Sequence, residues 1–182
     1  MDKQWYQSLA EESMGGQLLS QETCLQLLTD SRIELLSLLD AAYAVRKHFH
    51  GREVTVHIIN NVSNGRCSED FNYCPQSKGS SAEIVAYTEK TEQEIVAEAK
   101  QAYAAGAHRY CMVYAGRRPS RQRTERIATL VKTIKAQYPI EVCVSAGIMD
   151  AASTRLLKEA GLDRLNHNLN TAAGRYGKIC ST

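Results

Sequence analysis

The sequence predicts an α/β fold built on a parallel sheet of about four strands, preceded by N-terminal helices. Two observations predict it. Short segments rich in β-branched residues alternate with helical segments from residue 53 to residue 168. In addition, three of the four expected strands are entered through a helical segment. Parallel neighbouring strands need such long crossover connections, which are usually helices and right-handed. The chain therefore divides into a helical lead-in at 1–50 and an α/β domain at 51–182.

The lead-in at 1–50 is expected to be helical because its apolar residues recur at steps of three and four. Ser20, followed by Glu22 and Thr23, is typical of a helix start, and Gly51 is typical of a stop.

The alternation continues through the rest of the chain. Strands are expected at 53–60, 108–114, 140–146 and 163–168, and helices at 91–105, 121–137 and 151–160. Thr91 and Glu94 fit a capping box for the first of these helices, and Gly106 and Gly161 end the first and the third. Ligands gather at the carboxyl ends of parallel strands, so the polar residues there are the first candidates for a site.

Composition narrows the classes of function. The chain has 182 residues, 43% hydrophobic and 23% charged, with a net charge of +2. This balance gives no reason to expect a nucleic-acid or membrane partner. No run of about eighteen apolar residues and no secretory leader is visible, so we expect a cytoplasmic protein with reduced thiols. The arginine-rich run 117–123 fits either a solvated loop or a phosphate- or carboxylate-binding loop.

Six cysteines are the candidate metal ligands. Cys67 and Cys74 lie on a loop after the first expected strand, Cys111 late in the second strand and Cys143 in the third. Thiolates bind soft metals, but buried cysteines also serve as small apolar core residues, and the residues alone leave both readings open. The other two are Cys24 and Cys180.

The loop Cys67-Ser-Glu-Asp-Phe-Asn-Tyr-Cys-Pro-Gln-Ser77 resembles the cluster loop of biotin synthases, which reads C-P-E-D-C-x-Y-C-P-Q-S. The resemblance implies a radical S-adenosylmethionine barrel of the (β/α) TIM type, of which 51–182 would form a part. It also implies a [4Fe-4S] cluster held by three cysteines, with S-adenosylmethionine on the fourth iron. Cys67 and Cys74 match two of the ligands. The third position is Phe71, whose ring cannot ligate iron.

Further residues follow in the order of that family. Cys111 and Cys143 match cysteines that ligate an auxiliary [2Fe-2S] cluster inside the barrel. The run Asn166-His-Asn-Leu-Asn-Thr171 resembles the family segment N-H-N-L-D-T, which binds substrate and S-adenosylmethionine. Asn166, Asn168 and Asn170 would therefore bind cofactor, with Asn170 replacing the family's ribose-binding aspartate. Tyr73 would stack near the adenine. Without the resemblance, this run reads as a polar strand end with turn-forming asparagines.

The implied activity is sulfur insertion into dethiobiotin to form biotin, with a reductant protein as partner. Because about four strands of the barrel are expected, the resemblance also implies a truncated or divergent chain that pairs as a homodimer or with a complementary chain. The alternative from another class is a non-catalytic half-barrel that binds an iron–sulfur cluster as a scaffold.

Overall fold

The computed structural model describes residues 2–65 and 67–182. The chain forms two compact units, Met1–Val54 and Thr55–Thr182. The units are described separately below.

The first unit consists of three helices, α1 (Lys3–Met14), α2 (Gln21–Thr29) and α3 (Leu35–His50). Ser20 caps α2 by accepting a hydrogen bond from the Thr23 amide, and Gly51, with φ +57°, follows the last residue of α3. The buried Tyr6 hydroxyl accepts a hydrogen bond from the Glu34 amide at 2.7 Å, which ties α1 to the start of α3. The predicted helical character, the Ser20 start and the Gly51 stop are all confirmed.

The second unit contains a four-stranded parallel sheet, in the order β1 (His57–Asn61), β2 (Arg109–Val113), β3 (Glu141–Ser145) and β4 (Arg164–Leu165). The predicted α/β class and parallel sheet are confirmed. The register aligns Ile59 with Cys111, Cys111 with Cys143, and Cys143 with Arg164. These four residues form one row across the sheet, and their side chains share a face because alternate residues of a strand point to opposite faces.

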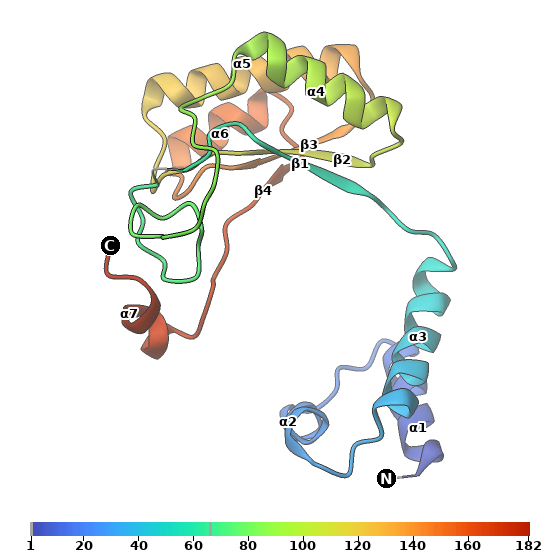
Figure 1. Ribbon diagram of the computed structural model, residues 1–182. Coiled ribbons are helices and arrows are strands. Elements are labelled where there is room, and N and C mark those ends of the chain that lie inside the picture. Colours follow the sequence, from blue (N-terminus) through green and yellow to red (C-terminus); the bar gives the residue numbers. More distant parts are fainter. Residues whose placement is uncertain (1, 66) are drawn as a thin grey trace. The chain divides into compact units, whose positions relative to one another are not determined.

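Helices α4 (Glu92–Ala104), α5 (Arg121–Gln137) and α6 (Ala151–Glu159) cover the other face of the sheet (Figure 1). Thr91 and Glu94 form the predicted capping box at the start of α4. The apolar core lies between sheet and helices. It includes Tyr110, Met112, Val142 and Val144 from the sheet, each 0% exposed. The face without helices we call the open face.

All four predicted strands are shorter in the structure, the first and the last most of all. The first begins at His57 instead of residue 53, and the last ends at Leu165 instead of residue 168. β1 begins at the level of Arg109, the first residue of β2, so no ladder partner is available before it. β4 pairs only two residues with β3, although β3 continues to Ser145. After β4 the chain forms a 3-10 turn, η1 (Ala173–Arg175), and the short helix α7 (Tyr176–Ile179), neither of which was predicted.

Candidate functional site

A cavity of about 380 Å³ lies at the carboxyl edge of the sheet, where the loops after the strands meet. It is lined by the loop 67–76, by the residues that follow β2, β3 and β4, and by α7 and Thr182. The predicted site residues that line it are Cys67, Phe71, Tyr73, Cys74, Asn168 and Asn170. Segments more than a hundred residues apart thus supply one cavity.

The loop from Cys67 to Ser77 is closed by its own backbone. The Cys67 amide donates to the Gln76 carbonyl at 2.9 Å, and the Ser77 amide donates to the Cys74 carbonyl at 3.1 Å. A parallel bridge pairs Cys67 with Ser77. These bonds bring the two ends of the loop together and leave both cysteines half-buried beside the cavity.

Aromatic side chains lie at the position of the missing thiol. The Phe71 ring packs 5.7 Å from the Tyr73 ring and meets the Tyr176 ring of α7 edge-on at 6.0 Å between centroids. Partial desolvation, and after it the Cys74, Tyr176 and Cys180 side chains, raise the pKa of Tyr73. Phe71 therefore anchors α7 to the loop.

The residues after α7 bind the same loop. The Asn72 amide donates to the Ile179 carbonyl at 2.9 Å, and the Ser181 amide donates to an Asp70 carboxylate oxygen at 2.8 Å. The Ser181 hydroxyl bonds the other Asp70 oxygen. Hydrogen bonds from Ser181, followed by one from Cys180, hold the pKa of Asp70 well below its usual range. We call this set of contacts the Asp70 brace.

The loops after β2 and β3 touch closely at the cavity. Gly147 has φ +78°, and a Cβ atom built there would lie 2.2 Å from the Arg117 carbonyl oxygen. The Ile148 amide donates to that same oxygen at 2.8 Å. A side chain at position 147 would force the two loops apart, so the glycine is needed for the close approach.

The asparagine run after β4 divides into two parts. Asn168 and Asn170 line the cavity, together with His167. Asn170 has φ +59°, and its side-chain amide donates to the Tyr176 hydroxyl at 3.2 Å. Asn166 lies outside the lining, but its side chain reaches the Ser145 hydroxyl at 3.4 Å, and Ser145 lines the cavity.

Cys111 and Cys143 lie apart from this cavity. Both are buried and lie opposite each other, each as the middle residue of its strand, so Cys111 stands at the centre of β2 and not late in it as predicted. The neighbouring Cys111 thiol, followed by the positive charges of Arg109 and Arg164, lowers the pKa of Cys143. The neighbouring Cys143 thiol, together with burial, raises the pKa of Cys111. The two thiols form a pair on the open face.

Charged residues surround the pair on the open face. Arg109 donates to Glu141 at 2.6 and 2.8 Å, and these bonds lower the pKa of Glu141. Because Arg109 and Arg164 also act on Cys143, negative charge on the thiol pair is stabilised from both sides.

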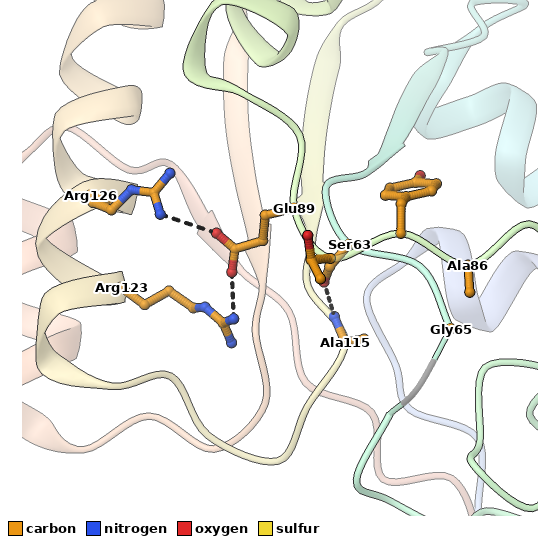
Figure 2. Close-up of a pocket in the computed structure, with 9 residues that line it drawn as sticks. Ser63, Gly65, Ala86, Glu89, Ala115, Arg123 and Arg126 are labelled. Atoms are coloured by element: carbon orange, nitrogen blue, oxygen red, sulfur yellow. Dashed lines mark hydrogen bonds and ion pairs between the residues drawn. The ribbon is translucent and has the colours of Figure 1, made fainter.

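A second cavity, of about 540 Å³, lies beside α5 (Figure 2). Glu89 accepts ion pairs from Arg123 and Arg126, the latter at 3.3 Å, so the carboxylate meets both guanidinium groups. The Ser63 hydroxyl accepts a hydrogen bond from the Ala115 amide at 2.8 Å. These charges are paired within the protein and join the segment before α4 to α5. For Arg123, the structure favours an ion-pair role over the predicted alternatives of a solvated loop or a free anion site.

The loop fits an iron–sulfur cluster only in part. Cys67 and Cys74 provide soft thiolate donors at the cavity, but Phe71 provides none. Among residues 2–65 and 67–182, no three His, Cys, Asp or Glu side chains already surround one point. No reaction step through a three-thiolate cluster can therefore be derived from this loop.

Sequence reasoning missed the contribution of α7 and of the residues after it. Tyr176 and Thr182 line the cavity, and Cys180 is buried behind the loop. A short helix with no capping side chain leaves little trace in a sequence. The available signal was the sixth cysteine, which had no assigned place.

The arrangement agrees with the comparisons to known proteins. The Radical SAM superfamily profile matches residues 61–182, which is the greater part of the chain. The chain therefore belongs to the Radical SAM superfamily.

Within that superfamily, the chain is similar to biotin synthases. It is 55% identical over 174 residues to a biotin synthase of Magnetococcus marinus, covering 96% of this chain and 54% of that protein. It is 48% identical to a biotin synthase of Acaryochloris marina, covering 93% of this chain and 49% of that one. The chain thus spans about half the length of these relatives. The predicted resemblance is confirmed.

Solved structures agree on the fold. A methylornithine synthase superposes with a TM-score of 0.71 at 26% identity, covering 86% of this chain and 46% of that one. A maturase of the [FeFe]-hydrogenase superposes with a TM-score of 0.77 at 18% identity, covering 100% of this chain and 40% of that one, and shows the fold alone. Within the described residues, no helix combines the length and apolar character needed to cross a bilayer.

Proposed function

We propose that this chain carries the cofactor-binding part of a biotin synthase-type enzyme, whose reaction is sulfur insertion into dethiobiotin. One observation carries the proposal. The cysteine loop, the loops after β2 and β3, and the asparagine run meet at one cavity, in a chain 55% identical to a biotin synthase over 96% of its length. The proposed domains are a helical lead-in at 1–50 and a partial barrel at 51–182.

In this proposal the cavity would hold S-adenosylmethionine beside a [4Fe-4S] cluster. Cys67 and Cys74 would hold irons, and Tyr73 would lie against the adenine. Asn168 and Asn170 offer amide groups to the ribose and to polar ends of the ligand. Asn166 would act through Ser145 instead of by direct contact.

We also propose that Cys111 and Cys143 ligate the auxiliary [2Fe-2S] cluster. Their support is positional: they are neighbours in register on the open face, and Arg109 and Arg164 favour a negative centre there. Such clusters usually have four protein ligands, so two must come from elsewhere.

Those ligands require further strands against the sheet. Among the described residues, β1 and β4 each pair on one side only, and Ile59 on the open face is 66% exposed. We propose that the barrel is completed by additional β/α units, supplied by a complementary chain or by a second copy in a homodimer. Because thiols stay reduced in the cytoplasm, the proposal places the chain there. It also includes a reductant protein that would supply electrons to the cluster.

Anaerobic reconstitution with iron and sulfide tests the proposal. The expected result is a four-iron electron paramagnetic resonance signal, after dithionite reduction, that changes on adding S-adenosylmethionine. The Cys67→Ser variant should lose it, whereas Cys24→Ser, at an exposed cysteine of the first unit, should keep it. A cluster-free wild type, or a signal indifferent to S-adenosylmethionine, would reject the enzyme reading.

The second candidate is an iron–sulfur scaffold without catalysis. Phe71 in place of a thiol and Asn170 in place of a carboxylate favour it, since both substitutions weaken cofactor binding. Dethiobiotin turnover separates the two, once the completing chain is added: a scaffold binds iron and forms no biotin.

A further inference from the structure

Three aromatic side chains line the cavity at the carboxyl edge of the sheet. The Phe71 ring stands between the other two, with its centroid 5.7 Å from that of Tyr73 and 6.0 Å from that of Tyr176. The ring planes are inclined by 51° and 75°, so the rings do not cover one another face to face. Aromatic faces carry negative partial charge, and inclined rings leave part of their faces open to a ligand. The cavity therefore offers aromatic faces at position 71, where the loop lacks a third thiol.

Hydrogen bonds fix two of these rings before any ligand binds. The Asn170 side-chain amide donates to the Tyr176 hydroxyl at 3.2 Å. The Asn72 amide donates to the Ile179 carbonyl at 2.9 Å, which ties the residue after Phe71 to the end of α7. Both rings are half-buried. Side chains that are already ordered lose little conformational freedom on binding, so their contacts contribute more to affinity.

Charged side chains do not by themselves give the cavity a preference for a cation. Among the described residues that line it, Glu69 carries a carboxylate and Arg117 a guanidinium, so the two charges offset each other. Arg117 is also suited to the carboxylate that an amino acid ligand carries. A preference for a cationic centre must then come from the ring faces, which attract onium cations within about 6 Å of a ring centroid.

S-adenosylmethionine, the ligand of the proposed function, contains such a centre, because its sulfur is a sulfonium cation. The cavity volume of about 380 Å³ lies in the range of small-molecule sites. We propose that the Phe71 ring, flanked by Tyr176, binds this sulfonium through a cation–π contact, so that the cavity takes a sulfonium in preference to a neutral thioether. The inference rests on the proposed function, which supplies the ligand, and it gives position 71 a binding role that needs no metal.

Calorimetric binding of S-adenosylmethionine and of S-adenosylhomocysteine to the full chain, without added iron, tests the proposal. The second compound has the same nucleoside and amino acid chain, but its sulfur is a neutral thioether. We expect the wild type to bind S-adenosylmethionine about threefold to thirtyfold more tightly. Phe71→Leu should bring this ratio close to one, because leucine keeps an apolar contact and has no aromatic face. Its affinity for S-adenosylhomocysteine should stay that of the wild type, which shows that the cavity is intact.

Two further variants serve as controls. Phe49→Leu replaces the other phenylalanine of the chain, in α3 of the first unit, and should keep the wild-type ratio. Phe71→Tyr keeps an aromatic face and should keep the ratio as well. Equal wild-type affinities for the two ligands, or a preference that Phe71→Leu retains, overturn the sulfonium contact and leave the proposed function standing. If neither ligand binds without iron, the sulfonium contact is also overturned, and cluster reconstitution alone decides the proposed function.

Discussion

The two faces of the β1–β4 sheet carry opposite kinds of side chains. On the helix-covered face, Met112 and Val144 are 0% exposed and belong to one apolar core. On the open face, Ile59 is 66% exposed, and the rest of its row across the sheet consists of Cys111, Cys143 and Arg164. Adjacent residues of one strand therefore differ in their surroundings: one face packs into the apolar core, and the other carries thiols and charged groups.

The difference between the two faces is tested most strongly by truncating two adjacent side chains of β2, one on each face. Met112→Ala should lower the free energy of unfolding by about 2–5 kcal/mol, because it leaves a cavity in the core. Cys111→Ala on the open face should lower it by only about 1 kcal/mol. Urea unfolding of both variants measures the difference. Equal losses would show that the open face is also part of the core.

The next largest loss of stability is expected from a substitution at the carboxyl edge of the sheet, where the loops after β2 and β3 meet. Gly147→Ala should cost about 3 kcal/mol, since alanine is strained at positive φ and its Cβ meets the Arg117 carbonyl. Gly116→Ala is the control: it also has positive φ, but nothing lies within 4 Å of its Cβ position. If both variants lose the same stability, the close approach of the two loops contributes nothing.

The helix-covered face also buries a polar group, the Tyr110 hydroxyl, whose removal tests how much its hydrogen bonds contribute to stability. The Tyr110 hydroxyl donates to the Ile95 carbonyl at 3.0 Å and accepts from the Asn60 side chain. Tyr110→Phe should cost about 2 kcal/mol, because two buried groups lose their partner. Chemical denaturation measures it, and hydrogen exchange should speed up at the amides of the first turns of α4. An unchanged midpoint would mean that water replaces the hydroxyl.

The smallest expected effect concerns the Asp70 brace and its pH dependence. The folded state depresses the pKa of Asp70, so the stability it contributes is present above the unfolded pKa, near 4, and is lost as pH falls further. Between pH 6 and pH 3, the wild type should therefore lose more stability than Asp70→Asn. Urea unfolding midpoints of both proteins across this pH range provide the test. If the midpoints of the wild type and of Asp70→Asn fall in parallel, the Asp70 brace contributes no pH-dependent stability.

Much of the covered face could be predicted, because its signals are local. The capping box at Thr91 and Glu94 marked the start of α4, and helical periodicity gave α5 its observed bounds. The strand ends could not be predicted, since β1 begins where its pairing with β2 begins and β4 pairs only two residues with β3. Strand bounds depend on a partner elsewhere in the chain.

Several residues of the site could be predicted from the sequence, but the long-range contacts that bring α7 to the cysteine loop could not. Cys67, Cys74, Asn168 and Asn170 were identified from their order and do line one cavity. The side-chain contact of Phe71 with Tyr176 joins residues 105 positions apart in sequence, and no local pattern encodes it. For the same reason Cys180 remained without a place until the fold was known.

The Asp70 brace also sets an order of events in folding. It joins Asp70 to Ser181, 111 positions apart in the sequence. Contacts of such long range form late, because the entropy of closing the intervening chain must first be offset by nearer contacts. During synthesis, the cysteine loop emerges long before Ser181 does. We therefore expect this contact to form last, after the sheet is in place, and the two thiols of the loop to stay more exposed to solvent until then.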